Sequence, residues 1–424
     1  MSIKNIKVVL LITIYVLFHY LYVNIIATNF NYQGFVINKV DGIDFIINGI
    51  IILFLILLNY FMKNSFYILI YNIVLLLVIY GQSIYSLYAG SNILFYYLII
   101  PQLFLFLLDK IDKKNFKVIR KQLDINNKYF AIIVVFVSIV IMVPFIRNIT
   151  SINISNLLLT NIYETRINSG LDYNIIIDYM YSSIARVFFP FLLIYFLIRK
   201  KYGVGMLILL FIILLFLLNG AVKSIIFGAV LSIFFYNFKY KVKDIVFQIS
   251  LLLLSIFSLI QYWLLHSIFF ADYIRRIFFL PAYLFNVYHN TFKNDYTYYS
   301  QTKIGQFLGF ENNYGKITSF IGQQVLGNRD MVANVGIFVE GYISYGIIGV
   351  IISSLIFVFI VFIIKSLDFK HQFFGLIFAY LYIINTSFIE TLLMTHGLLF
   401  LIIFGYFFIP TSEINLKGEN KRWN

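Results

Sequence analysis

Residues 336–364 read GIFVEGYISYGIIGVIISSLIFVFIVFII and contain one charged side chain, that of Glu340. About 20 mostly apolar residues suffice for a helix to cross a bilayer, so this stretch predicts a membrane span. The whole chain has the same character, because 61% of its 424 residues are hydrophobic and only 12% are charged. Soluble globular proteins have about 25% charged residues. The composition therefore excludes a water-soluble enzyme and a disordered chain, and it predicts an all-α polytopic membrane protein.

Twelve stretches of the chain are apolar enough to be membrane spans. They lie at about 6–28, 43–62, 65–88, 92–108, 129–149, 179–198, 204–219, 222–238, 245–265, 336–364, 372–389 and 392–410. The seventh, eighth, eleventh and twelfth are short, so their boundaries are the least defined. With the N-terminus inside, 21 of the 32 Lys and Arg residues fall in inside loops or tails and 10 fall outside. This bias predicts that both termini are cytoplasmic.

The net charge of +14 follows from this topology, since basic inside loops also contact anionic inner-leaflet lipid. Nucleic acid is therefore not an expected partner. Two outside loops are long, 147–178 and 266–335, and neither is apolar enough to be an independent domain. We therefore expect one integral membrane domain over 1–424. The high content of Phe, Tyr, Ile and Asn suggests an AT-rich bacterial genome, hence a bacterial cytoplasmic (inner) membrane.

The larger outside loop opens with ADYIRRIFFLPAYLFNVYHNTF at 271–292. Its apolar residues recur at helical spacing: Ile274, Ile277, Phe278, Leu284, Phe285 and Tyr288. Pro281 is expected to kink the helix. The pattern predicts a helix that lies in the membrane interface, with Arg275 and Arg276 at headgroup level.

Several kinds of chemistry are excluded by the motifs. The chain has no cysteine, no DxD, no HExxH and no phosphate-binding glycine loop, and NGAVKS at 219–224 lacks the glycine spacing of such a loop. The five histidines show no metal-ligand spacing. We therefore expect no metal and no cofactor.

Five cations are expected on the outer side of the membrane. Arg186 lies about seven residues, or roughly 10 Å, below the outer end of the sixth span. Lys223 opens the eighth span, and Arg166, Arg275 and Arg276 lie in the outside loops. Arginine offers a rigid fork of donors that suits phosphate oxygens, so the cluster would fit a substrate with a pyrophosphate. The alternatives are an ion pair of Arg186 with Glu390, snorkelling side chains and solvated loop charges.

Three candidate acid–base groups lie on the same side. Glu340 is about one turn into the tenth span, whereas Glu390 and His396 flank the junction of the last two spans. A buried carboxylate has a raised pKa and a histidine titrates near neutrality, so each is a possible general base. The alternatives are a packing hydrogen bond for Glu340 and a cap or turn for His396.

At these segments the sequence resembles the Wzy-type O-antigen and capsule repeat-unit polymerases. The main match is to the family pattern N-x-G-x-[FY]-x-[DE]-G-Y followed by two glycines, in Asn334, Gly336, Phe338, Glu340, Gly341, Tyr342, Gly346 and Gly349. Glu340 stands where aspartate is common in the family. A second match is Thr395-His396-Gly397, which resembles the family's late T-H-G. Looser likenesses are YETR around Arg166, the stretch around Arg186 and the basic residue that opens the eighth span. The motifs cover about 60 residues.

The resemblance implies a glycosyltransferase that joins undecaprenyl-pyrophosphate-linked repeat units into O-antigen or capsular polysaccharide. The active site would face the periplasm or the cell exterior. Arg166, Arg186 and Arg276 would bind pyrophosphate, with Arg275 a close second to Arg276, and His396 or Glu340 would activate the acceptor hydroxyl. Expected partners are the lipid-linked oligosaccharide, membrane lipid, and a chain-length regulator and flippase of the same pathway.

Three other functions stay open. An O-antigen ligase would share the fold, the arginines and the base. A flippase or transporter of the lipid-linked unit would need cations through both halves of the membrane, whereas here they gather near the outer ends. A sensor or structural membrane protein is the third. Tyrosines at 83–88 and 294–301 suit sugar rings but also belong to ordinary interfacial belts.

Overall fold

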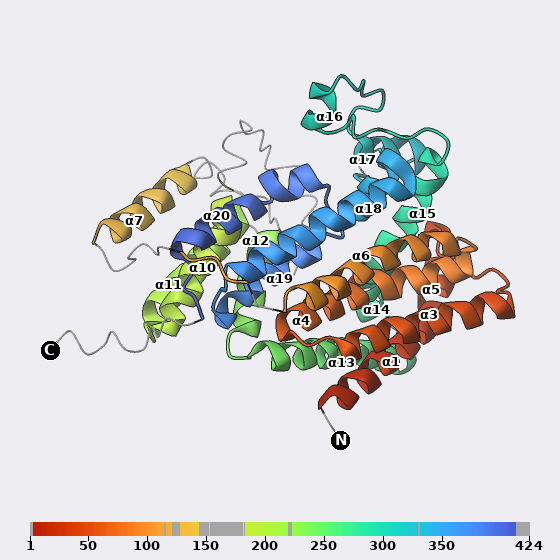
Figure 1. Cartoon of the computed structure of the whole chain (residues 1–424), viewed down its shortest axis with the longest axis horizontal. Coiled ribbons are helices and arrows are strands. Elements are labelled where there is room, and N and C mark those ends of the chain that lie inside the picture. The colour runs from red at the N-terminus through yellow and green to blue at the C-terminus, as the bar shows by residue number, and fades with distance from the viewer. Residues whose placement is uncertain are drawn as a thin grey trace. The chain divides into compact units, whose positions relative to one another are not determined.

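The structure, a computed structural model, describes residues 3–113, 116–120, 128–143, 152, 181, 183–218, 223–329 and 331–412. Every regular element in this described part is a helix (Figure 1). By their internal contacts the residues form two compact units. Unit 1 comprises 1–115, 240–362 and 381–389, and unit 2 comprises 116–239, 363–380 and 390–424.

Unit 1 contains most of the long helices. Its elements are α1 (Ile3–Leu21), η1 (Tyr22–Ile26), α2 (Ala27–Asn29), η2 (Asn31–Gln33), α3 (Gly42–Phe61), α4 (Ser65–Val74), η3 (Leu75–Ile79), α5 (Tyr80–Ala89), α6 (Asn92–Ile111), α13 (Tyr240–Leu265), α14 (Phe269–Ile274), η7 (Arg275–Phe279), α15 (Leu280–Phe292), α16 (Lys303–Phe307), α17 (Ile317–Phe320), η8 (Ile321–Val325) and α18 (Ile337–Ser366), whose last residues belong to unit 2. The continuous helix α4–η3–α5 forms the core, since 94% of its apolar window is buried.

Unit 2 contains the shorter apolar helices. Its elements are α7 (Lys128–Met142), η6 (Ile184–Phe188), α10 (Phe189–Ile198), α11 (Tyr202–Leu218), α12 (Lys223–Phe235), η9 (His371–Phe373), α19 (Phe374–Ile383, which ends in unit 1), η10 (Thr391–Thr395) and α20 (Leu398–Phe408). Aromatic rings hold them together. The Phe191 ring lies 5.5 Å from that of Phe373 and 4.9 Å from that of Phe404, centroid to centroid.

Six helices of the described part are long and apolar enough to cross a membrane. They are Ile3–Asn29, Gly42–Phe61, Ser65–Ala89, Asn92–Ile111, Tyr240–Leu265 and Ile337–Ser366. Each of the other six predicted spans coincides with a shorter apolar helix of 10–17 residues. The prediction of an all-helical, multi-pass membrane protein is therefore confirmed, whereas the count of twelve spans and their orientation stay predictions.

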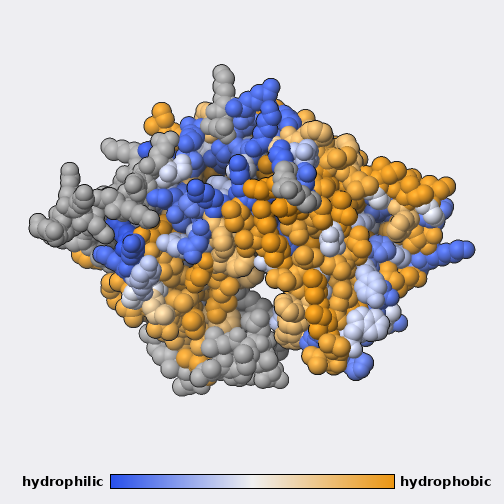
Figure 2. Space-filling model, turned by 90° about the horizontal axis from the view of Figure 1, so that it is seen from below, coloured by the Kyte–Doolittle hydropathy of each residue, from blue (hydrophilic) through white to orange (hydrophobic). Residues whose placement is uncertain are grey.

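The outward faces of the long helices are apolar. On α3 the exposed fractions are 65% for Ile43, 60% for Ile46, 60% for Ile50 and 54% for Leu57. Their spacing places them on one side of the helix. Figure 2, seen from below relative to Figure 1, shows apolar residues over much of the described surface. A surface of this kind fits lipid and not water.

The predicted span 336–364 coincides with α18, which is kinked near its start. Tyr345 and Gly346 have non-helical backbone angles, and φ of Gly346 is +59°, a conformation that favours glycine. The two halves then pack against each other where Gly341 meets Gly349, since a Cβ on either glycine would overlap the backbone of the other. The predicted span thus coincides with a helix that is kinked, and Glu340 lies on the short part that precedes the kink.

The segment 271–292 is helical, as predicted, but its surroundings differ from the prediction. Ile274, Phe278, Phe285 and Tyr288 are each at most 1% exposed. Phe278 packs on helix α5, because a Cβ on Gly81 would overlap its carbonyl oxygen. The expectation that this apolar face lies against lipid is therefore wrong, since other helices of unit 1 cover it.

Candidate functional site

The structure brings Arg186 and His396 together within unit 2. The Arg186 guanidinium places Nη1 2.5 Å from Nδ1 of His396 and 3.4 Å from the Thr395 carbonyl oxygen. The two residues are 210 positions apart in the sequence. Both residues were predicted site residues, but with different tasks: pyrophosphate binding for Arg186 and proton transfer for His396. Their contact makes them one unit of the candidate site, which we call the Arg–His pair.

Both halves of the Arg–His pair are built on π-helical turns. Arg186 lies within the turn Ile184–Phe188, and His396 directly follows the turn Thr391–Thr395. A π-helical turn accommodates one extra residue and so redirects the side chains that follow it, and such turns are frequent at functional sites. The first turn continues directly into the apolar helix α10, whereas the second is followed by His396 and Gly397 and only then by α20.

The backbone around His396 is fixed from two sides. The Tyr380 hydroxyl donates a hydrogen bond to the His396 carbonyl oxygen at 2.8 Å. Gly397 has φ +82°, and a Cβ at this position would crowd Ser183. Only glycine satisfies both conditions. The glycine of the T-H-G motif is therefore needed to hold His396 against the helix that carries Arg186.

The contact decides which hydrogen-bonding role each histidine nitrogen has. A guanidinium has donors only, so Nδ1 of His396 must accept, and the proton of the neutral ring then lies on Nε2. His396 therefore offers an N–H donor rather than a basic nitrogen at Nε2. A cationic guanidinium and a neutral N–H donor are both groups that bind phosphate oxygens.

Glu390 is the carboxylate of unit 2 nearest in sequence to this pair. It directly precedes the π-helical turn that leads to His396, and its side chain is half-buried. Glu390 and His396 are thus joined by one turn of backbone.

Glu340, the carboxylate of the best-matching motif, lies in unit 1. It is 1% exposed, and its Oε2 accepts a hydrogen bond from the Ile389 backbone N–H at 2.6 Å. The Ile337 N–H donates in parallel to the Ile384 carbonyl oxygen at 3.1 Å. Burial and the nearby Glu340 carboxylate raise the pKa of Tyr299 in the large loop. These contacts favour the packing role that the sequence left open for Glu340, because the carboxylate ties residues 384–389 to the start of α18.

Arg275 and Arg276 differ in their surroundings. Arg275 is 6% exposed, donates to Asp272 at 2.6 Å and to Gln33 at 2.5 Å, and lies 4.3 Å above the Phe30 ring. Arg276 pairs with Asp272 through Nε at 2.8 Å, but its side chain is 52% exposed. The contacts favour a structural role for Arg275 and leave Arg276 as the accessible cation of the two.

The two remaining cations that were predicted for the site are Arg166 and Lys223. Arg166 and the loop 147–178 that carries it lie outside the described residues, apart from position 152. Lys223 is the first residue of α12, as predicted.

A contact between His289 and Tyr342 was missed by sequence analysis. His289 Nδ1 lies 2.5 Å from the Tyr342 hydroxyl, and the Tyr342 ring stacks on Tyr97 with centroids 5.7 Å apart. Burial and the neighbouring Lys293 lower the pKa of His289. Tyr342 was selected as part of the motif, but its partner is 53 residues away and no spacing signal could have found it.

The other motif residues have architectural tasks. Gly336 lets the backbone approach Ile384 and Asn385. The three remaining glycines form the break in α18 and the crossing of its two parts. Asn334 is exposed at the end of the large loop.

No family model, no curated protein and no solved structure matches this chain.

Proposed function

We propose that the chain is a polymerase of lipid-linked oligosaccharide repeat units, acting at the outer face of the bacterial cytoplasmic membrane. The observation that carries the proposal is the contact between Arg186 and His396, two residues that the family resemblance singled out independently. The multi-pass helical architecture supports it, since the donor and acceptor are both held in the bilayer by polyprenyl chains.

The proposed reaction is a glycosyl transfer. A hydroxyl oxygen of the acceptor unit attacks the anomeric carbon of the donor glycan, and a bond forms between them. The bond from that carbon to the pyrophosphate oxygen breaks, and undecaprenyl pyrophosphate leaves with the electron pair. The hydroxyl proton passes to a carboxylate.

The Arg–His pair would stabilise the leaving group. Negative charge grows on the pyrophosphate oxygen as the bond breaks, and donors that are already oriented lower the barrier most. Arg186 supplies charge and a planar fork, and His396 supplies the Nε2–H donor. Arg166 and Arg276 would contribute further cations to the pyrophosphate, as the resemblance implies.

We assign the base to Glu390. Nδ1 of His396 is engaged by Arg186, and Glu340 is almost fully buried and bonded to the Ile389 backbone. Glu390 is half-buried and belongs to the same unit as Arg186 and His396.

The experiment is reconstitution with one substrate. The purified chain is given only the lipid-linked repeat unit of its own cell, without nucleotide, and the products are separated on a gel. A ladder of repeat multiples supports the polymerase. Transfer of the unit across a proteoliposome membrane without a ladder would instead establish the transporter.

A further inference from the structure

A crevice lies within unit 1, with about 280 Å³ of empty space that includes open solvent. Apolar side chains form most of its wall, among them Val78, Leu98, Phe285 and Phe338. Much of this space is open to solvent, so the enclosed part has room for one small functional group and not for a whole sugar ring.

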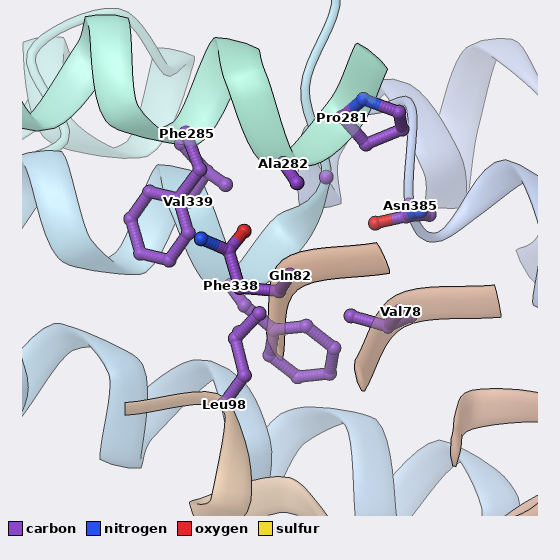
Figure 3. A pocket seen from close by; sticks show the side chains of 10 residues that line it. Val78, Gln82, Leu98, Pro281, Ala282, Phe285, Phe338, Val339 and Asn385 are labelled. Carbon is purple, nitrogen blue, oxygen red and sulfur yellow. The ribbon is translucent and has the colours of Figure 1, made fainter. Parts of the chain in front are cut away.

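Gln82 is a polar residue in this wall and has an unused donor. Its side chain comes from α5, it is 2% exposed, and its Nε2 has no hydrogen-bond partner among the described residues. Figure 3 shows the amide directed into the space between Phe285 and Phe338. A buried donor without a partner costs about 1–3 kcal/mol. Native structures contain few such groups, and each calls for an explanation.

Asn385 supplies an acceptor on another side of the crevice. It follows α19, and its Nδ2 donates to the Leu77 carbonyl oxygen at 3.3 Å. Oδ1 is the acceptor end of the same amide, and Figure 3 shows this amide directed toward the crevice. The residues that line the crevice therefore offer one donor and one acceptor on apolar walls, and none of them is charged.

We propose that the crevice binds the acetamido group of an N-acetylated amino sugar in the substrate. The acetamido carbonyl would accept from Gln82 Nε2, its N–H would donate to Asn385 Oδ1, and its methyl group would contact Phe285. A free hydroxyl lacks the methyl group, and a carboxylate would bring an unpaired charge into an apolar wall. The inference rests on the proposed function, since it names the sugar class that the polymerase would accept.

The place of the crevice agrees with an oligosaccharide on the outer side. Gln82 lies about six residues, or roughly 9 Å, from the expected outer end of the span 65–88. Pro281 and Phe285 come from the large loop that is expected outside. Gly336 and Val339 come from the motif segment that best resembles the polymerase family.

The test measures sugar binding without chain extension. The full chain in nanodiscs is titrated with N-acetylglucosamine, N-acetylgalactosamine, glucose and galactose, and binding is followed by saturation-transfer NMR. Nanodiscs avoid competition by sugar-based detergents. We expect the two N-acetylated sugars to bind with the strongest transfer at the acetamido methyl protons, and the two parent sugars to bind at least about tenfold more weakly.

Gln82→Leu removes the donor and should weaken N-acetylated sugar binding by about tenfold. The matched control is Gln102→Leu. Gln102 is a fully buried glutamine of the same unit, donates to the Tyr71 carbonyl oxygen at 3.2 Å and does not line the crevice. The Gln102→Leu variant should bind N-acetylated sugars as tightly as the wild type. Should Gln82→Leu not fold, Asn385→Leu removes the acceptor and gives the same comparison.

Equal binding of N-acetylated and parent sugars by the wild-type chain would overturn the proposal, as would an unchanged affinity in Gln82→Leu. Binding of none of the four sugars would also overturn it and would indicate that the crevice holds only water. Acetamido-selective binding without a glycan ladder would support the crevice and refute the polymerase, so the two failures are distinguishable.

Discussion

Replacing Arg186 with lysine keeps a positive charge in unit 2 but removes the planar fork. The arginine places Nη1 at 2.5 Å from His396 Nδ1 and 3.4 Å from the Thr395 carbonyl oxygen, and its guanidinium carries further N–H donors in the same plane. A lysine ammonium is a single point charge on a flexible stem. It cannot hold His396 and present an aligned pair of donors to the leaving group at the same time.

The expected loss of rate follows from the proposed role of Arg186 in stabilising the leaving group. Removal of one preorganised donor from a transition-state charge costs about 2.7–4 kcal/mol, or roughly 10²–10³ in rate. We therefore expect Arg186→Lys to extend chains about 100- to 1,000-fold more slowly, with a smaller change in the KM for the lipid-linked unit. The loss belongs to kcat because the charge develops only as the bond breaks.

Substitutions of His396 distinguish a role as hydrogen-bond donor from a role as general base. A glutamine side chain carries an N–H near the position of Nε2 but cannot take a proton, so His396→Gln should keep more activity than His396→Ala. The double variant with Arg186→Lys should lose less than the sum of the two single losses, because the residues act as one unit.

The assay is single-turnover formation of the first repeat dimer, with enzyme in excess and products separated on a gel. Arg199→Lys is the matched control, since Arg199 ends the same helical segment and lies over the Tyr195 ring at 4.5 Å. Its rate should be that of the wild type. A rate for Arg186→Lys within about threefold of wild type, in a protein that unfolds at the same temperature, would refute the pyrophosphate role. Inactivity of His396→Gln to the level of His396→Ala would refute the donor role.

Three further outcomes are expected from thermal and chemical unfolding in detergent. Gly349→Ala places a Cβ into backbone and should lower stability by about 1–3 kcal/mol, whereas Gly49→Ala, whose Cβ meets nothing within 4 Å in α3, should be neutral or gain up to about 1 kcal/mol. Arg275→Gln should cost about 1–3 kcal/mol, because it removes the buried hydrogen bonds to Asp272 and Gln33, and Arg276→Gln, half exposed, should change stability by less than about 1 kcal/mol. Because the pKa of His289 is lowered in the folded state, the unfolded chain binds the proton more readily, so stability should fall as pH drops below the unfolded value of about 6.5, and His289→Gln should remove that component.

For each of these three predictions, one result would contradict it. Equal stability of Gly349→Ala and Gly49→Ala would contradict the close crossing in α18. Arg276→Gln as damaging as Arg275→Gln would mean that both arginines are structural. A pH dependence that survives in His289→Gln would assign the acid sensitivity to other groups.

The membrane character and the positions of the helices could be predicted from the sequence, because runs of apolar residues have one favourable environment. The break in α18 could not, since Tyr345 and Gly346 interrupt the helix without interrupting its apolar character. The interfacial assignment of 271–292 failed for a related reason. Helical periodicity reveals an apolar face but does not distinguish lipid from neighbouring helices as its partner.

The candidate site was predicted in part. Arg186 and His396 were selected because charged and titratable groups are rare in apolar segments. That they are partners was beyond the sequence, since the contact depends on two π-helical turns and on Gly397. Gln82 was not selected at all, because a buried amide becomes informative only when its hydrogen-bond partners are known.

The most direct test of the pyrophosphate role is ³¹P NMR of undecaprenyl pyrophosphate mixed with the purified chain in a phosphorus-free detergent. The wild-type chain is predicted to shift and broaden both phosphorus resonances, and Arg186→Gln is predicted to leave them as in the protein-free sample, with Arg199→Gln behaving as wild type. Equal shifts with the wild-type chain and with Arg186→Gln would contradict the claim that the Arg–His pair binds the pyrophosphate.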